Sequence, residues 1–303
     1  MPVTPASKRF LHPEAIKRLA RMELRARYLV EGFLSGMHRS PYFGQSVEFL
    51  QHREYSVGDD LRHVDWKVWA RHDRLTVKQY EEDTNLRCTL LVDVSGSMRY
   101  GNGPLNKFEY ACTVASSLAY LVLKQQDAIG LVAFDEQVRA SLAARSKRNH
   151  LFALIESLSK LEPQDKTDVQ QLFRNIAESY AQRGLMIVIS DLLVNADEAI
   201  RGLQQLRQRG HDVLVFHILD DDELDFPFRG PTRFEGLELP QHLNCNPRAL
   251  RDGYLESLHR YLDQIRHGCA RATIDYALIR TSQPLDAALA SYLSNRLGMH
   301  HKN

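Results

Sequence analysis

The chain has 303 residues, of which 44% are hydrophobic and 25% are charged. This is the composition of a globular protein and argues against extensive disorder, and the length allows one large domain or two smaller ones. The 39 basic and 38 acidic side chains leave a formal net charge of +1, so the overall charge favours neither nucleic acid nor an anionic membrane as a partner.

The four cysteines stand singly in the sequence, without any Cys-x-x-Cys pair, which excludes the common thiolate zinc patterns and gives no signature of a disulfide scaffold. The N-terminal residues are basic but include no apolar core followed by a cleavage site, and no apolar stretch is long enough to cross a membrane. The sequence therefore predicts a cytoplasmic protein with no signal peptide and no transmembrane segment.

Residues 1–85 are expected to form an N-terminal extension that packs on the main domain. Residues 13–31 carry apolar side chains at helical spacing and basic ones around the rest of the wheel, which predicts an amphipathic helix. Its basic face is expected to be solvated, and docking to an acidic partner is the alternative. Short strand-like pieces at 47–50 and 75–80 make the rest of the extension rich in β-structure.

The segment from Arg53 to Arg71 is dense in charge and tryptophan but shows neither a helical nor a strand period. Trp66 and Trp69 are expected to pack it onto the main domain. Its charged side chains are expected to form a local lattice of ion pairs and hydrogen bonds. Binding of a partner or an anion is the alternative for this charged set, which comprises Arg53, Asp59, Arg62, Asp65 and Arg71.

In residues 86–303 apolar strands alternate with helical stretches, the pattern of a mostly parallel sheet with helices on both faces. The expected strands are 88–93, 128–134, 185–190, 213–219 and 274–280, with helices near 107–124, 147–161, 168–183, 196–209, 248–267 and 285–297. The piece 137–141 follows its strand too closely for a crossover helix, so it is predicted to be an antiparallel edge strand. The predicted fold class is α/β with a Rossmann-like sheet.

The first strand of this domain runs directly into an Asp-x-Ser-x-Ser turn formed by Asp93, Ser95 and Ser97. Buried strands of open α/β sheets end at the edge where ligands bind, so a carboxylate and two hydroxyls at that edge indicate a site for a hard cation. The alternative is a capped turn, in which the serine hydroxyls bond backbone groups before the helix that begins near Lys107.

Two later residues strengthen the cation hypothesis. Thr167 lies at the predicted start of a helix, and Asp191 follows the apolar run 185–190. In this order the residues resemble the metal-ion-dependent adhesion site of von Willebrand factor type A domains, in which such groups surround one Mg²⁺. The resemblance implies a von Willebrand A-like fold, with Mg²⁺ held by Asp93, Ser95, Ser97, Thr167 and Asp191 and with Mn²⁺ or Ca²⁺ as alternative ions.

A second set of motifs resembles the bacterial domain-of-unknown-function fifty-eight family, in which Arg-x-Tyr, Gly-Asp, Asp-Trp and Ala-Arg precede a von Willebrand A-like domain. These motifs are Arg53-Glu54-Tyr55, Gly58-Asp59, Asp65-Trp66 and Ala70-Arg71, followed later by Asp220 to Glu223, Phe226-Pro227-Phe228 and Tyr276 to Thr281. The match covers roughly residues 40–295. It implies a metal-dependent adaptor that acts with a MoxR-type AAA+ ATPase, or with its client, in the assembly or maturation of other proteins.

These observations favour a non-enzymatic protein-interaction module. The sequence has no phosphate-binding glycine loop with its lysine and no Gly-x-Ser-x-Gly elbow, which argues against an ATPase and an acyl-transfer hydrolase. The rival enzyme is a Mg²⁺-dependent phosphoaspartate hydrolase with Asp93 as nucleophile, but Ser95 stands where its general acid would be. A metal-free structural scaffold is the third hypothesis.

The acidic run Asp220 to Glu223 is expected to cap the next segment, with a second cation site as the alternative.

Overall fold

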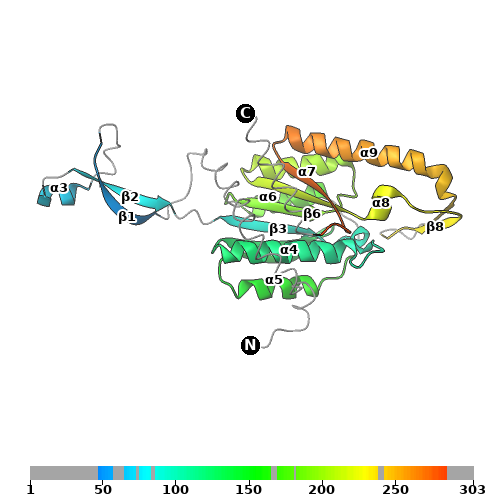
Figure 1. Ribbon diagram of the computed structural model, residues 1–303, viewed down its shortest axis with the longest axis horizontal. Coiled ribbons are helices and arrows are strands. Elements are labelled where there is room, and N and C mark those ends of the chain that lie inside the picture. The colour runs from blue at the N-terminus through cyan, green and yellow to red at the C-terminus, as the bar shows by residue number, and fades with distance from the viewer. Residues whose placement is uncertain are drawn as a thin grey trace. The chain divides into compact units, whose positions relative to one another are not determined.

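Figure 1 shows the fold of the chain as a computed structural model, which describes residues 47–56, 65–72, 75–82, 86–164, 169–180, 182–237 and 242–284. The described residues belong to two compact units, divided between Asn85 and Leu86. The helices predicted at 13–31 and 285–297 lie outside the described residues.

The main unit is built on a six-stranded sheet. Its strands, in spatial order, are β10 (Asp275–Arg280), β7 (Asp212–Leu219), β6 (Leu185–Ser190), β3 (Arg87–Asp93), β4 (Ala128–Phe134) and β5 (Val138–Arg145). The first five strands are parallel, and β5 is the antiparallel edge strand that the sequence predicts, although it extends to Arg145. All residues of β6 are buried, as expected of a strand covered on both faces. The predicted α/β fold class is confirmed.

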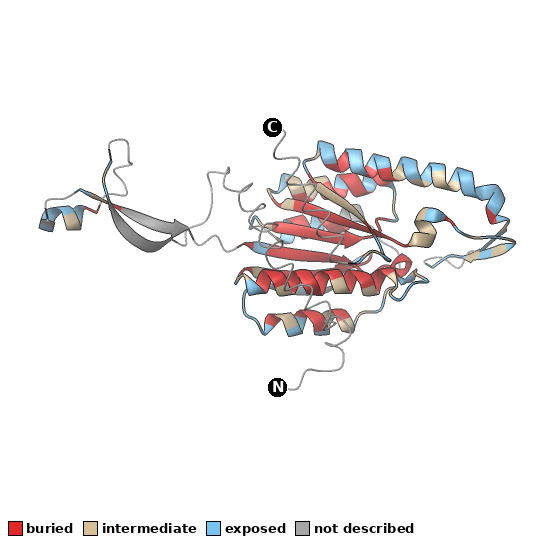
Figure 2. Ribbon diagram, viewed as in Figure 1, coloured by how far each residue is buried: buried red, intermediate tan, exposed pale blue. Residues whose placement is uncertain are grey.

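Helices cover both faces of this sheet (Figure 1). On one face lie α4 (Lys107–Lys124) and α5 (His150–Ser159), and on the other lie α6 (Val169–Ser179), α7 (Ala196–Gln208) and α9 (Pro247–Arg271). The central strands and much of α4 are buried, as Figure 2 shows. A core cluster that includes Phe134, Phe173 and Leu203 joins the sheet to α6 and α7.

The strand register brings the carboxyl ends of β3 and β6 to the same level. Val92 pairs with Ile189, so Asp93 and Ser190, the last residues of the two strands, stand side by side. The following segments, 94–97 and 191–193, therefore start at one edge of the sheet. The helix α4 begins near this edge too, after Asn106, which forms a capping box with Glu109.

Four elements of the main unit are absent from the sequence prediction. They are the 3-10 turn η2 (Gly96–Arg99), the helix α8 (Asp221–Asp225) and the hairpin of β8 (Thr232–Glu235) with β9 (His242–Cys245). Each has only four or five residues, too few to produce a readable period of apolar side chains. The hairpin is tied to the body by ring contacts of Phe226 with Phe234 and with Tyr254.

The N-terminal unit contains an antiparallel pair of strands, β1 (Val47–Glu54) and β2 (Thr76–Glu82), and the helix α3 (Trp66–His72). The segment 53–71 shows no helical or strand period in the sequence, yet its ends lie in β1 and α3, while residues 57–64 lie outside the described ones. The sequence did not predict the helix α3, because it has only two turns and is stabilised by a tertiary contact. The buried Asp65 accepts a hydrogen bond from the Val68 amide at 3.3 Å and donates its own amide to Thr76 at 2.8 Å.

Trp66 and Trp69 lie on α3 and contact each other edge to face, with ring centroids 6.1 Å apart. They are 54% and 43% exposed in the described structure. Asp59 and Arg62 of the charged set lie outside the described residues. The packing of this unit on the main domain stays a prediction.

Candidate functional site

The candidate site begins with Asp93, the last residue of β3. Its side chain is almost fully buried, and it accepts hydrogen bonds from the Ser95 amide, to Oδ1 at 2.9 Å, and from the Ser190 hydroxyl, to Oδ2 at 2.5 Å. The first bond closes a tight turn at the strand end, as aspartates commonly do. The second fixes Asp93 to the neighbouring strand β6.

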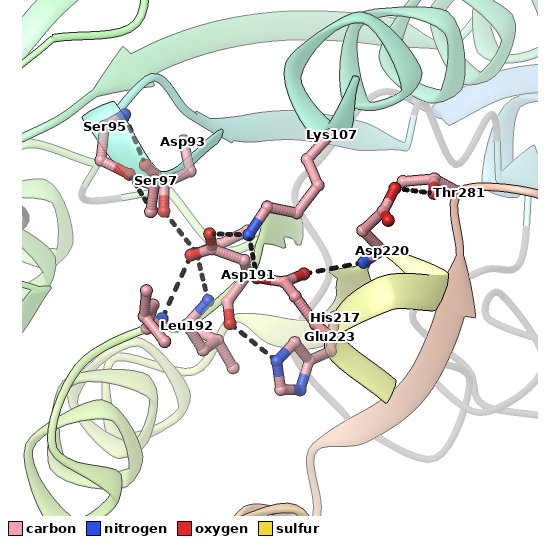
Figure 3. A network of polar contacts seen from close by, with 12 residues as sticks. Asp93, Ser95, Ser97, Lys107, Asp191, Leu192, His217, Asp220, Glu223 and Thr281 are labelled. Carbon is pink, nitrogen blue, oxygen red and sulfur yellow. Dashed lines mark hydrogen bonds and ion pairs between the residues drawn. The ribbon is translucent and has the colours of Figure 1, made fainter. Parts of the chain in front are cut away.

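Ser95 and Ser97 follow at the start of η2, and both are buried. Their hydroxyl oxygens lie 3.0 Å apart. The Ser95 hydroxyl is also hydrogen-bonded to Asp93, and the Ser97 hydroxyl to Asp191. The two serines thus link the two carboxylates (Figure 3).

Asp191 directly follows β6, and both of its carboxylate oxygens have partners. Oδ1 accepts from the Leu193 amide at 3.1 Å, and Oδ2 lies 2.7 Å from the ammonium nitrogen of Lys107. The adjacent Leu192 has a left-handed backbone with φ of +46°, an unfavourable conformation for a branched residue that surrounding contacts must hold.

Two side chains supply those contacts by bonding backbone carbonyls of this loop. His217 on β7 places Nε2 2.7 Å from the Asp191 carbonyl oxygen and Nδ1 2.8 Å from the Tyr276 hydroxyl. The Tyr261 hydroxyl donates to the Leu192 carbonyl. Because a carbonyl only accepts, Nε2 of His217 carries the proton and Nδ1 accepts from Tyr276.

The structure therefore brings together four of the five predicted ligands, Asp93, Ser95, Ser97 and Asp191. Thr167 lies outside the described residues, so its role stays a prediction. Within the described part of the chain no cluster of three or more His, Cys, Asp or Glu side chains has the arrangement of a metal site. A cation here would depend on two carboxylates completed by neutral hydroxyls.

The pKa values of Asp93 and Asp191 are shifted in opposite directions. Burial raises the pKa of Asp93 to about 7, and the nearby charge of Asp191 adds to the rise, while hydrogen bonds from Ser190 and Ser95 oppose it. Burial also acts to raise the pKa of Asp191, but the Lys107 ammonium outweighs it and holds that pKa below its usual value. Two buried carboxylates thus repel each other, and a cation would relieve that repulsion.

The oxygen atoms of these four side chains are of the chemical type that binds divalent ions. Carboxylate and hydroxyl oxygens are hard ligands of the kind that Mg²⁺ prefers. The cluster lies at the carboxyl edge of a mostly parallel sheet, where α/β proteins place their ligands. The four side chains are nearly inaccessible to solvent, which strengthens electrostatic interactions among them.

Four polar residues of the site were not predicted from the sequence: Lys107, Ser190, His217 and Glu223. Lys107 is fully buried and bridges Asp191 to Glu223, whose Oε1 lies 2.8 Å from its ammonium nitrogen. A lysine at a helix start usually indicates a solvated face, and nothing local distinguishes this one. His217 lies in an otherwise apolar buried strand, which is the one signal that could have drawn attention to it.

The acidic run behaves as the predicted capping turn. Asp220 is the N-cap of α8 and forms a capping box with Glu223. Asp221 pairs with Arg280 at 3.0 Å, and Asp222 accepts from the Asn102 amide group at 2.6 Å. Each acidic side chain already has a protein partner, which disfavours the alternative of a second cation site.

The fold and the site together define an α/β protein with an oxygen-rich cluster at the carboxyl edge of its sheet. The chain belongs to the family described as "Protein of unknown function DUF58", whose model matches residues 51–261. It is similar to an uncharacterized protein of Mycobacterium tuberculosis (strain ATCC 25618 / H37Rv), Rv1480, with 24% identity over 293 residues, covering 94% of this chain and 90% of the relative.

The chain is also similar to solved structures. One is an aerotolerance-related membrane protein from Bacteroides fragilis, with 16% identity and a TM-score of 0.47, covering 71% of this chain and 100% of that one. Another is the VWA domain of SpRpn10, with 13% identity and a TM-score of 0.41, covering 70% and 95% of the two chains. In the described residues of the present chain, no helix has the length and apolar character needed to cross a membrane.

Proposed function

We propose that this protein is a non-enzymatic interaction module whose partner binding depends on a divalent ion at the carboxyl edge of the sheet. Asp93, Ser95, Ser97, Thr167 and Asp191 would hold the ion. Mg²⁺ is the expected ion, and Mn²⁺ and Ca²⁺ are alternatives. When bound, the ion would attract a carboxylate of the partner, because hydroxyl ligands leave its charge incompletely neutralised.

The observation that carries this proposal is the arrangement of two buried carboxylates joined by two hydroxyls. Asp93 ends β3 and Asp191 follows the adjacent strand β6, and the serine hydroxyls that connect them are 3.0 Å apart. Backbone amides of Ser95 and Leu193 hold the two carboxylates in place. Such a preorganised set of oxygens needs little rearrangement to accept a cation.

The surroundings of the site suit a protein partner. Leu193, two residues beyond Asp191, is 59% exposed and offers an apolar contact beside the charged cluster. The family resemblance favours a MoxR-type AAA+ ATPase, or one of its clients, as that partner. The proposal places the protein's role in the assembly or maturation of other proteins.

The second candidate is a metal-free scaffold, and one observation favours it. Lys107 already supplies a positive charge 2.7 Å from Asp191 Oδ2. If this charge is sufficient, the cluster serves only to fix the loops at the strand ends. The partner could then bind the same face without any ion.

Calorimetry with Mg²⁺ and Mn²⁺ on the full chain and an Asp93→Ala variant separates the two candidates. The ion-dependent module requires heat of binding in the wild type and its loss in the variant. A matched control is Asp263→Ala, which removes an exposed carboxylate paired with Arg266 on α9. This control should bind the ion as the wild type does.

Affinity capture of a MoxR-type ATPase then tests the function itself. Capture by the wild type in Mg²⁺ should exceed capture in chelator, and Asp93→Ala should behave in both as the wild type does in chelator. Equal capture in Mg²⁺ and chelator by a protein that binds no ion would refute the ion-dependent module and support the scaffold.

A further inference from the structure

Lys107 occupies a position that is unfavourable for a cation. It is the first residue of α4, next to the N-cap Asn106, and none of its surface is exposed. The N-terminal end of a helix carries a partial positive charge, so it favours acidic side chains and disfavours an ammonium. Burial adds a large desolvation cost.

Two carboxylates from distant parts of the chain compensate this cost. Asp191 Oδ2 lies 2.7 Å and Glu223 Oε1 2.8 Å from the Lys107 ammonium nitrogen, as Figure 3 shows. Lys107 therefore joins the loop after β6 to the helix after β7 through two ion pairs.

The connection continues beyond Glu223. The other carboxylate oxygen of Glu223 accepts from the Asp220 amide at 2.8 Å, and Asp220 Oδ2 accepts from the Thr281 hydroxyl at 2.7 Å. A continuous polar chain thus leads from Asp191 through α8 to the end of β10. The position of α8 is consequently tied to that of Asp191.

The charges around the candidate ion site also depend on Lys107. Asp93, Asp191 and Glu223 supply three carboxyl groups, and the Lys107 ammonium forms ion pairs with two of them, Asp191 and Glu223. Replacing a buried ion pair by apolar groups is often harmless, whereas removing one partner leaves the other charge buried and unpaired. Loss of Lys107 alone would leave the buried Asp191 and the partly buried Glu223 without this charged partner.

We propose that Lys107 is a positioning residue, an internal cation that holds Asp191 and α8 in place while no divalent ion is bound. This role does not require the ion. A second consequence rests on the proposed function: a divalent ion should stabilise the protein more when Lys107 is absent, because it then neutralises a carboxylate that has no other cation.

The test uses the full chain and thermal melts followed by circular dichroism in chelator. Lys107→Met keeps most of the side-chain volume and should lower Tm by about 5 to 15 °C. The matched control is Lys160→Met, which removes an exposed lysine paired with Glu156 at 2.8 Å and should lower Tm by about 2 °C or less. Equal melting temperatures of Lys107→Met and the wild type would overturn the inference.

A second-site variant separates charge compensation from packing. Adding Asp191→Asn to Lys107→Met removes the more deeply buried of the two unpaired charges, so the double variant should melt at a higher temperature than Lys107→Met alone. If Lys107→Met does not fold, recovery of folded protein by Asp191→Asn is the same result. A double variant that melts no higher, or that also fails to fold, would show that Lys107 acts through packing and would overturn the inference.

Repeating the melts in Mg²⁺ tests the link to the ion. The rise in Tm should be larger for Lys107→Met than for the wild type, and an equal or smaller rise would overturn this part. Absence of any Mg²⁺ effect in both proteins, with rescue by Asp191→Asn intact, would refute the proposed ion site but support the internal cation. The two proposals therefore fail in distinguishable ways.

Discussion

The hydroxyl of Ser190 lies 2.5 Å from Asp93 Oδ2 and joins the end of β6 to the end of β3. The same hydroxyl oxygen accepts from the Leu192 amide at 2.9 Å. One side chain therefore holds both the Asp93 carboxylate and the loop that carries Asp191. The geometry of the candidate site depends on this contact between adjacent strands.

Ser190→Ala should destabilise the protein by about 1–3 kcal/mol, because it leaves a buried carboxylate oxygen and a buried amide without their partner. Urea unfolding measures this change. Ser179→Ala is the control, since the Ser179 hydroxyl bonds the Asn175 carbonyl on the exposed surface of α6. The control should change stability by about 0.5 kcal/mol or less. Equal effects of the two substitutions would contradict the role assigned to Ser190.

Ser97→Ala should weaken Mg²⁺ binding about tenfold, equivalent to about 1.4 kcal/mol, because it removes a neutral hydroxyl ligand while leaving both carboxylates. Thr167→Ala should have a similar effect if Thr167 completes the shell. Calorimetric titration measures the affinity, and circular dichroism confirms folding. Folded variants with unchanged Mg²⁺ affinity would remove these hydroxyls from the site.

His217 should stay neutral in the folded protein well below the pH at which it protonates in the unfolded chain. Burial lowers its pKa from 6.5 to about 4, although the Asp191 carboxylate and carbonyl act in the opposite direction. Since the folded pKa lies below the unfolded one, the unfolded state binds the proton first as pH falls. Stability is therefore lost between pH 6.5 and about 4, and this histidine contributes about 3 kcal/mol of the loss.

Nuclear magnetic resonance of labelled histidine side chains tests this directly. At pH 5.5 the His217 ring should show the neutral form with the proton on Nε2. The same ring should be protonated in protein unfolded by urea at that pH. A charged His217 in the folded protein at pH 5.5 would disprove the prediction.

Phe173→Ala should cost about 3–5 kcal/mol as a large-to-small change in the core. Phe173 is fully buried and packs edge to face on Phe134, with ring centroids 5.5 Å apart. Phe152→Ala is the control because Phe152 is 47% exposed on α5, and it should cost less than half as much. Denaturant unfolding compares the two. A smaller loss for Phe173→Ala than for Phe152→Ala would contradict the packing of α6 on the sheet.

No turnover of phosphate esters or ATP is expected from the purified protein. Ser95 stands two residues after Asp93, where a phosphoaspartate enzyme needs a general acid, and a hydroxyl does not supply that function at neutral pH. Rates should equal those of an Asp93→Asn variant. Mg²⁺-dependent turnover that disappears in Asp93→Asn would instead establish the hydrolase.

The sequence determined the main sheet and its helices to within a few residues. Strands β3, β4, β6 and β7 consist mainly of apolar residues, and such strands are typical of a sheet that is covered on both faces. The position of Asp93, Ser95, Ser97 and Asp191 at one edge also followed from the sequence, because the carboxyl ends of parallel strands share an edge. These properties depend on local patterns and on general rules of α/β topology.

Tertiary structure alone decided the electrostatics of the site. Lys107 is separated by 84 residues from Asp191 and by 116 from Glu223, so no local pattern shows that it is buried between them. Burial and charge pairing arise from contacts between distant segments, whereas the periodic patterns that predict strands and helices involve residues close together in the sequence.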